Sequence, residues 1–140
     1  MTFPRDPPAD RVLLVDVANV VGSRPDGWWH DRAGAASRLL ESLARLRGET
    51  AERPDGGPAA RLTEIVAVIE GTARSATGPD SVQVVSAERD GDTEIVAQAE
   101  RIVADGAIPL VVTADRGLRH RLPAGAEVVG PKWLNRLVGR

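Results

Sequence analysis

Three short apolar segments, far apart in this 140-residue chain, each run directly into an acidic side chain. The segments span residues 11–16, 65–70 and 108–115, and their last residues are Asp16, Glu70 and Asp115. Short runs rich in Val and Ile are typical of strands that are buried on both faces, as in parallel sheets. Because parallel strands share one direction, their carboxyl ends meet at one edge, where open α/β sheets bind ligands. We therefore expect a parallel sheet with an acidic site at that edge.

Helical and further strand patterns fill the intervals between these segments. Apolar residues recur every three or four positions between Trp28 and Arg47 and again between Asp90 and Asp105, which predicts two amphipathic helices. Further strands are expected at 82–86 and 126–129, and short helices at 116–122 and 133–138. Strands that alternate with helices imply right-handed crossovers between parallel strands. The sequence thus predicts a Rossmann-like α/β fold of three layers, with a mostly parallel sheet and helices on both faces.

The length of the chain predicts a single domain, residues 1–140, because such a chain can bury about two thirds of its unfolded surface. The charged, proline-containing stretch 1–10 is expected to be a flexible N-terminal tail. Residues 49–61, with two prolines and two glycines, are expected to form an exposed internal loop. No apolar run approaches the ~20 residues of a membrane span, and there is no cysteine. We expect a cytoplasmic protein that does not bind membranes.

Asp16 and Asn19 stand at the exit of the first predicted strand. In one interpretation Asp16 binds a metal ion, while Asn19 orients the carboxylate or contacts the substrate. In the other, Asp16 forms an Asx turn and caps a following helix, which is the commoner use of such residues. The residues alone leave both interpretations open.

Asp115 stands at the exit of a later strand, before an arginine-rich stretch. It suits a helix N-cap, but a capping position also directs a carboxylate into the crevice at the sheet edge, where it could bind the same metal ion. Arg116, Arg119 and Arg121 would then lie where a phosphate chain passes. Because a planar guanidinium binds phosphate through two hydrogen bonds, we expect these arginines to bind the substrate.

Acidic residues are crowded at the start of the central predicted helix. Asp90, Asp92 and Glu94 fall within five residues, which is more than the N-cap and the helix dipole require. Asp92 is the preferred metal ligand, and Glu94 is its expected catalytic assistant. Glu70, at the end of the second strand, is a further metal ligand in one interpretation and pairs with Arg74 in another.

Carboxylates gathered in this way require compensation. Two carboxylates ~4 Å apart repel each other by about 4 kcal/mol at an effective dielectric constant of ~20. A divalent cation removes that repulsion, and an all-oxygen site selects Mg²⁺ or Mn²⁺ over zinc. Such a site suits phosphodiester hydrolysis by a metal-activated water. Trp28 and Trp29 follow a turn, and such aromatic residues stack on unpaired bases in single-strand binders; we assign Trp28 to substrate binding.

Three of these stretches together resemble the PIN-like nuclease superfamily and, within it, the NYN or YacP-like branch. The matching residues are 14–20 (LVDVANV), 90–96 (DGDTEIV) and 111–118 (VVTADRGL). The resemblance covers nearly the whole chain, from Val12 to about Val138. It implies a PIN-type sheet in which five strands, numbered along the chain, lie in the order 3-2-1-4-5.

The resemblance also implies the activity of an endoribonuclease that cleaves RNA with Mg²⁺ or Mn²⁺. The residues that match the family's acids are Asp16, Asp92 and Asp115, with Glu94 or Glu70 as the fourth. Thr93 follows Asp92 where the family usually has a second acid, and Glu70 stands where the family commonly has Asp. These departures leave the identity of the fourth acid open.

The alternative function follows if a metal ligand has been lost. The protein would then be a catalytically inactive module that binds RNA or a protein partner. A HAD-type phosphatase also begins with a strand and an aspartate, but it needs a second Asp where Ala18 stands. The expected partner is RNA, single-stranded or structured. A homodimer and an antitoxin-like or RNA-processing protein partner are left open.

Overall fold

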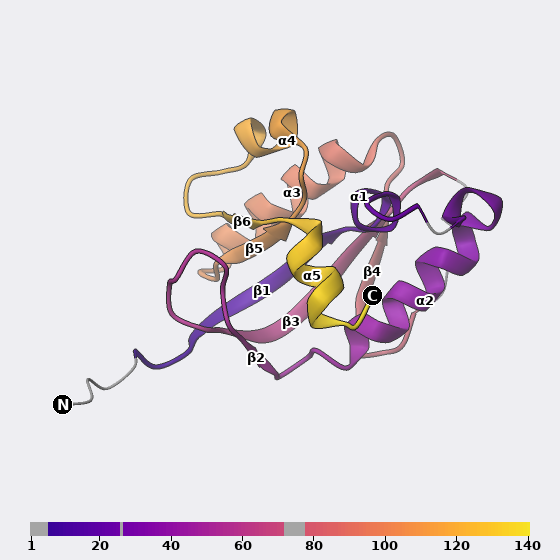
Figure 1. Cartoon of the computed structure of the whole chain (residues 1–140). Coiled ribbons are helices and arrows are strands. Elements are labelled where there is room, and N and C mark those ends of the chain that lie inside the picture. Colours follow the sequence, from indigo (N-terminus) through magenta and orange to yellow (C-terminus); the bar gives the residue numbers. More distant parts are fainter. Residues whose placement is uncertain (1–5, 26, 72–77) are drawn as a thin grey trace.

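A six-stranded sheet lies between two layers of helices in the computed structural model of the chain, which describes residues 6–25, 27–71 and 78–140 (Figure 1). The strands are β1 (Ala9–Asp16), β2 (Thr50–Ala51), β3 (Ala60–Ile69), β4 (Gln83–Ser86), β5 (Pro109–Val112) and β6 (Glu127–Val129). The helices are α1 (Val17–Gly22), the short 3₁₀ helix η1 (Trp28–His30), α2 (Arg32–Ala44), α3 (Gly91–Ala104), α4 (Arg116–Arg121) and α5 (Pro131–Leu137). The predicted three-layer α/β architecture is therefore confirmed.

β1 lies in the middle of the sheet, between β3 and β5, with β4 and β6 outside them. These five strands are parallel to their neighbours and, numbered along the chain, follow the order 3-2-1-4-5. The strand order that the family resemblance implied is thus confirmed. β2 is a further strand, which runs antiparallel to the start of β3.

β1 and β3 pair in two registers, separated by one extra residue. Residues 9–11 pair with 60–62, whereas residues 12–16 pair with 64–68, so Thr63 has no partner in β1. The Thr63 hydroxyl donates a hydrogen bond to the Arg11 carbonyl at 3.3 Å. An extra residue of this kind forms a bulge, which bends a strand locally.

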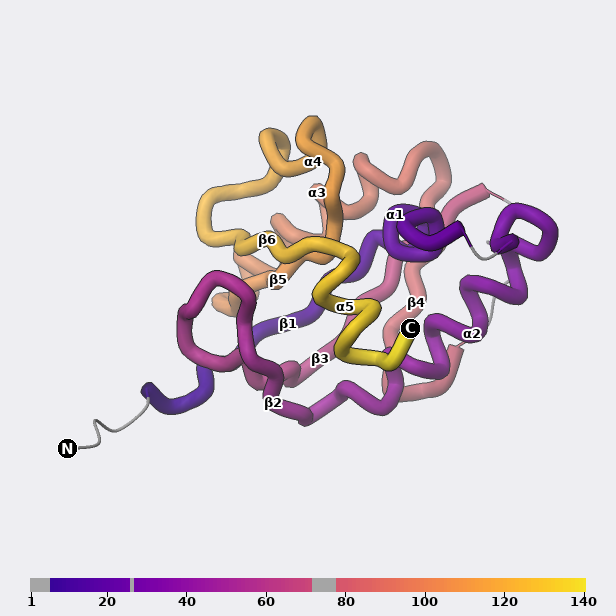
Figure 2. Tube along the Cα trace, viewed as in Figure 1, coloured from indigo at the N-terminus to yellow at the C-terminus, as the bar shows by residue number. Residues whose placement is uncertain are grey.

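Alternating side chains of the central strands fill a hydrophobic core on each face of the sheet. In β1, Leu13 and Val15 belong to one core, and Val12 and Leu14 belong to the other. This division follows from strand geometry, because successive side chains point to opposite faces. The helices α1, α2 and α5 pack on the first core, while α3 and α4 pack on the second (Figure 2). Within the described part of the chain, no helix has the length and hydrophobicity of a membrane span.

The helix predicted from Trp28 to Arg47 is shorter than expected. It begins at Arg32, because the carboxylate of Asp31 accepts a hydrogen bond from the Gly34 N–H at 3.0 Å and caps the helix there. Trp28 belongs to η1 instead. Helical periodicity gave no sign of α1, since its six residues are too few to show a period and include three valines; only the capping interpretation of Asp16 indicated a helix there.

The stretch 49–61 is mostly exposed between its ends, as its composition predicted, but both of its ends pair in the sheet. It includes β2, and both Ala51 and Ala60 are buried because they pair across the antiparallel ladder. β2 thereby covers the start of β3, a part of the strand that β4 leaves without a neighbour. The indole N–H of Trp133 also donates to the Glu52 carbonyl at 2.9 Å, which ties this stretch to α5.

The predicted N-terminal tail of residues 1–10 ends earlier than expected. Residues 1–5 lie outside the described part of the chain, but Ala9 and Asp10 already belong to β1. They pair with Ala60 and Arg61, and Arg61 Nε donates to the Asp10 carboxylate at 2.6 Å. Strand pairing and this ion pair therefore order the last residues of the stretch.

Candidate active site at the carboxyl edge of the sheet

Asp16 ends β1 and is almost completely buried, with 7% of its surface exposed. The register of β1 and β5 pairs Val15 with Val112, so Asp16 and Thr113 are neighbours at the strand ends. Thr113 Oγ1 donates to Asp16 Oδ2 at 3.3 Å, and the Asn19 N–H donates to Oδ1 at 3.3 Å. The second hydrogen bond caps α1, so the capping interpretation is confirmed while the carboxylate remains at the sheet edge.

Burial raises the pKa of Asp16 from 3.8 to about 6. The hydrogen bonds from Asn19 and Thr113 oppose this shift, whereas the negative charges of Asp92 and Glu70 add to it. A buried carboxyl group with like charges nearby resists ionisation, because its charged form loses water and meets repulsion. Asp16 therefore lies in a negative electrostatic field.

Asp92 and Asp115 approach each other from α3 and from the start of α4. Burial is the main cause that raises the pKa of Asp92, followed by the charge of Asp115 and a hydrogen bond between the two carboxyl groups. The charges of Asp90 and Glu70 contribute in the same direction. Asp115 also accepts a hydrogen bond from the Leu118 N–H at 3.0 Å, which caps α4 as the simpler interpretation predicted.

Glu70 follows the last residue of β3, and its carboxylate reaches the first turn of α3. Glu70 Oε2 accepts a hydrogen bond from the Gly91 N–H. A Cβ atom on residue 91 would lie 2.7 Å from Oε2, so a glycine is needed for the carboxylate to remain there. The sequence interpretation missed Gly91, although a glycine between two aspartates at a helix start was a visible signal. The alternative partner of Glu70, Arg74, lies outside the described residues.

Asp90 and Glu94 accept hydrogen bonds from residues of α3. Asp90 caps α3 by accepting hydrogen bonds from the Thr93 N–H at 2.7 Å and the Thr93 hydroxyl at 3.1 Å, and these bonds lower its pKa. Glu94 accepts from Gln98 Nε2 at 3.0 Å, one turn further along the helix. The acid that acts electrostatically on both Asp16 and Asp92 is Glu70. A catalytic role for Glu94 stays a prediction.

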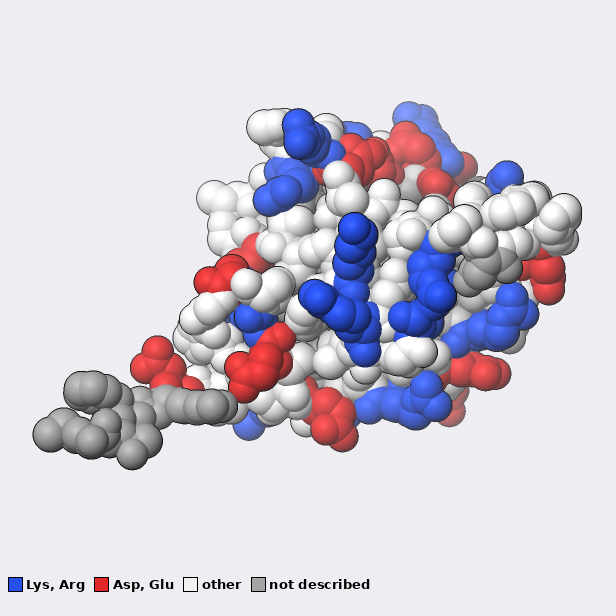
Figure 3. Space-filling model, in the orientation of Figure 1, with Lys and Arg blue, Asp and Glu red and all other residues white. Residues whose placement is uncertain are grey.

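The predicted substrate-binding residues flank the carboxylates. Asn19 Oδ1 accepts a hydrogen bond from the Ala114 N–H at 2.9 Å and so joins α1 to the exit of β5. Arg116, Arg119 and Arg121 are exposed on α4, and Arg121 donates to the Thr93 hydroxyl at 3.2 Å. In Figure 3, acidic atoms gather at the upper edge of the molecule beside basic atoms over α4. Negative and positive side chains therefore adjoin at this edge.

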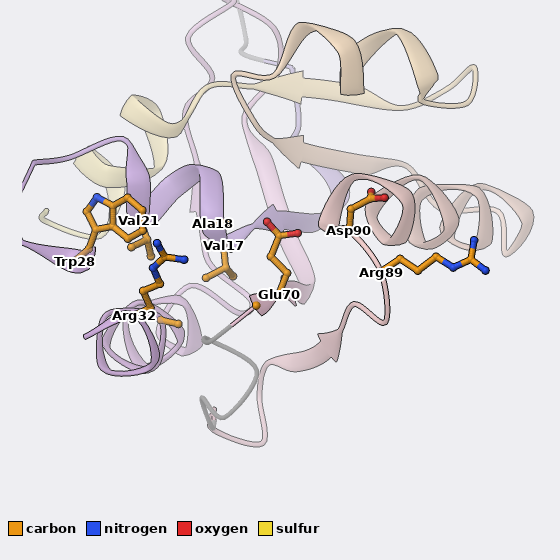
Figure 4. A pocket seen from close by; sticks show the side chains of 10 residues that line it. Val17, Ala18, Val21, Trp28, Arg32, Glu70, Arg89 and Asp90 are labelled. Carbon is orange, nitrogen blue, oxygen red and sulfur yellow. The ribbon is translucent and has the colours of Figure 1, made fainter. Parts of the chain in front are cut away.

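Trp28 and Trp29 differ in exposure. Trp29 is 51% exposed, while Trp28 is half-buried and packs against the core. Trp28 also lines a hollow beside the acidic edge, and Glu70 lies on the opposite wall (Figure 4). The tryptophan that was assigned to substrate binding thus lines the same hollow as Glu70.

The described residues contain no group of three or more acidic or histidine side chains that could hold a metal ion together as they stand. The carboxylates of Asp16, Glu70, Asp92 and Asp115 nevertheless act on one another electrostatically. All their donor atoms are oxygens, the ligands that Mg²⁺ and Mn²⁺ prefer. The donor set thus fits a hard divalent cation, but ligation by three of these groups requires the side chains to move closer together.

The strand order and the helices on both faces define a three-layer α/β protein. Among solved structures, the chain is similar to Rae1 (YacP) from Bacillus subtilis, determined as its W164L mutant. The TM-score is 0.69 at 19% sequence identity, and the alignment covers 92% of this chain and 75% of that chain. No protein-family model and no curated protein matches the sequence. At this identity the similarity establishes a common fold.

Proposed function

We propose that the protein is a metal-dependent endoribonuclease that hydrolyses RNA phosphodiester bonds at the carboxyl edge of its sheet. The observation that carries this proposal is the mutual effect of carboxylates from distant parts of the chain. Burial and neighbouring acids raise the pKa of both Asp16 and Asp92, and Asp115 is within hydrogen-bonding reach of Asp92. Groups with strongly shifted pKa values in a crevice are frequent at catalytic sites.

In this proposal, Asp16, Asp92 and Asp115 hold Mg²⁺ or Mn²⁺, and Glu70 is a further ligand or acts through a bound water. The bound ion would supply an activated water and stabilise the negative charge that develops on the phosphate. The chain's own groups position the ligands: Thr113 holds Asp16 through its hydroxyl, and the Gly91 N–H holds Glu70. Each of these hydrogen bonds fixes the orientation of a carboxylate.

The exposed arginines of α4 are the proposed binding groups for RNA phosphates. Arg116 and Arg119 are exposed beside Asp115, which caps the same helix. Their guanidinium groups can bind phosphate oxygens with two hydrogen bonds and offset repulsion between the RNA and the acidic edge. Asn19 is expected to fix the exit of β5 relative to α1, through its hydrogen bond with Ala114.

Two independent similarities support the proposal. The three motifs at 14–20, 90–96 and 111–118 resemble those of the YacP-like branch of PIN-like nucleases. The solved structure with a similar fold carries the name YacP. Sequence motifs and fold therefore point to the same branch.

A cleavage assay tests the proposal directly. The purified protein is incubated with mixed RNA in Mg²⁺, in Mn²⁺ and in EDTA, next to the Asp16→Asn variant. We expect cleavage with either ion and none in EDTA, and a decrease of at least about a hundredfold in Asp16→Asn. The Glu64→Gln variant, which alters an exposed strand carboxylate, should cleave like the unmodified protein. Equal cleavage by Asp16→Asn and the unmodified protein would exclude this active site.

A second candidate function is an RNA-binding or partner-binding module without nuclease activity. It is favoured by the absence, among the described residues, of a group of three acids ready to hold a metal ion. This function predicts RNA binding that is the same in EDTA and in Mg²⁺, with no cleavage product in either. The assay above therefore separates the two candidates.

A further inference from the structure

A hollow of about 370 Å³ adjoins the acidic edge between α1, α2 and the start of α3 (Figure 4). Its apolar surface is formed by Val17, Ala18, Val21 and Ala36. Trp28 and Arg32 lie on one side of it, and Glu70 and Asp90 lie on the other. Val17 and Ala18 directly follow Asp16 in the chain. A molecule in this hollow would therefore contact Glu70 and the two residues that follow Asp16.

Trp28 is held in place before any ligand binds. Its ring packs against Gly22, where an added Cβ would lie 3.6 Å from Trp28 Cζ2. Trp29 meets it edge to face, with ring centroids 6.1 Å apart, and the Arg32 guanidinium lies 5.4 Å from its centroid. An aromatic surface that is already ordered loses little entropy when a ligand stacks on it.

These groups match the chemistry of a nucleobase. Aromatic rings and arginine guanidinium planes are the surfaces on which proteins stack unpaired bases. A carboxylate such as that of Glu70 can accept a hydrogen bond from the amino group of a base. A base inside a duplex is stacked on both faces and paired along its edge, so only an unpaired base can enter such a hollow.

We propose that this hollow binds one unpaired nucleobase of the RNA, next to the phosphate that lies at the acidic edge. This inference rests on the proposed function and adds a base-binding subsite beside the acidic edge.

The test compares the two adjacent tryptophans in an Asp16→Asn background, where the RNA stays intact. The probe is a fluorescein-labelled RNA single strand of roughly a dozen nucleotides, and its binding is measured by anisotropy in EDTA and in Mg²⁺. We expect Trp28→Ala to raise the Kd about tenfold and Trp29→Ala to change it less than about twofold. The matching RNA duplex should compete poorly for the same site.

An abasic scan of the RNA separates base binding from a general loss of structure. Removal of one particular base should weaken RNA binding to the Trp29→Ala protein about tenfold. The same removal should not weaken RNA binding to the Trp28→Ala protein any further, because the contact between that base and Trp28 is already lost. Ala18→Leu, which narrows the hollow without removing the tryptophan, should weaken binding in the same way. Melting temperatures of all variants show whether each one is folded.

The inference and the proposed function fail in different ways. Three results would overturn the base site, even if the protein cleaves RNA. Trp28→Ala and Trp29→Ala could bind the RNA equally, or the duplex could compete as well as the single strand. The third result is an abasic RNA that weakens binding to Trp28→Ala as much as it weakens binding to Trp29→Ala. A protein that shows the base effect but cleaves no RNA with either metal ion would overturn the nuclease function and leave base binding supported.

Discussion

Carboxylates lie at both edges of the sheet, but their surroundings are opposite. At the amino edge, Glu127 is paired with Arg11, whose Nε lies 2.7 Å away, and with Arg53. The hydrogen bond from Arg11 is the main reason that the pKa of Glu127 is lowered. At the carboxyl edge, burial and neighbouring acids raise the pKa of Asp16 and Asp92 instead.

This difference separates a structural charge cluster from a candidate site. The ion pairs of Glu127 are complete within the protein and link β6 to β1 and to the stretch after β2. Neighbouring acids at the carboxyl edge help to raise the pKa of Asp16 and Asp92, so a bound cation would lower the electrostatic free energy of that edge. The edge at which the pKa of two acids is raised is also the one at which open α/β sheets bind ligands.

The two edges should also respond to pH in opposite directions. Glu127 has a lowered pKa, so its contribution to stability is present above its unfolded pKa of 4.5 and is lost as the pH falls through its folded value. Asp16 has a raised pKa, so its contribution to stability is fully present below its unfolded pKa of 3.8. That contribution is lost as the pH rises through its folded value of about 6.

The largest stability effect is expected at the carboxyl edge, in Asp16→Asn. A shift from 3.8 to about 6 corresponds to about 3 kcal/mol of unfolding free energy lost on ionisation. Asparagine stays uncharged, so Asp16→Asn should be the more stable protein at neutral pH and similar to the unmodified one at about pH 4. Urea unfolding in EDTA at both pH values measures the difference. An equal gain at the two pH values would show that the charge of Asp16 is not its source.

At the amino edge, removal of the charge should destabilise the protein. Glu127→Gln leaves Arg11 and Arg53 without their shared partner, and their side chains are only 13% and 8% exposed. Because Glu127 itself is a third exposed, we expect a loss of about 2 kcal/mol, below the value for a fully buried pair. Thermal or urea unfolding at neutral pH measures it, with the exposed Glu64→Gln as the matched control. A gain in stability would mean that the two edges do not differ as described.

The smallest effect is expected from the cation itself. At ~10 mM Mg²⁺ and a Kd of ~1 mM, binding to the folded protein should add about 1.4 kcal/mol to its unfolding free energy. Thermal unfolding with MgCl₂ and with NaCl of equal ionic strength distinguishes binding from screening. Asp16→Asn should lose this stabilisation, while Glu127→Gln should keep it. Equal stabilisation of both variants would place the cation elsewhere.

Much of the fold could be predicted because its strands are short and apolar on both faces. Leu13, Val15 and their alternating neighbours carry that pattern, and the family resemblance supplied the strand order. β2 could not be predicted, because it has only two residues and Ala51 becomes buried only through pairing with β3. α1 was indicated only by the capping interpretation of Asp16, because its valines disfavour a helix locally. The helix is stabilised by the Asp16 cap and by packing on the core.

The candidate site was predictable as a set of acids but not in its detail. The topology alone brings Asp16, Glu70 and Asp115 to one edge, because each follows a parallel strand. The choice between Glu94 and Glu70 depends on side-chain partners, and Gln98 engages Glu94 one turn along α3. Thr113 was seen only as part of a motif, since its bond to Asp16 follows from the register between two strands.

The extra residue at Thr63 divides the β1–β3 ladder into two segments that can vary independently. Upstream of it, the pairing involves the start of β1 and the stretch that carries β2; downstream, it runs without interruption to the end of β1. A change of length near the N-terminus or after β2 can be absorbed at this bulge. The alignment of Asp16 with the end of β3 is therefore insulated from variation at the far end of the sheet.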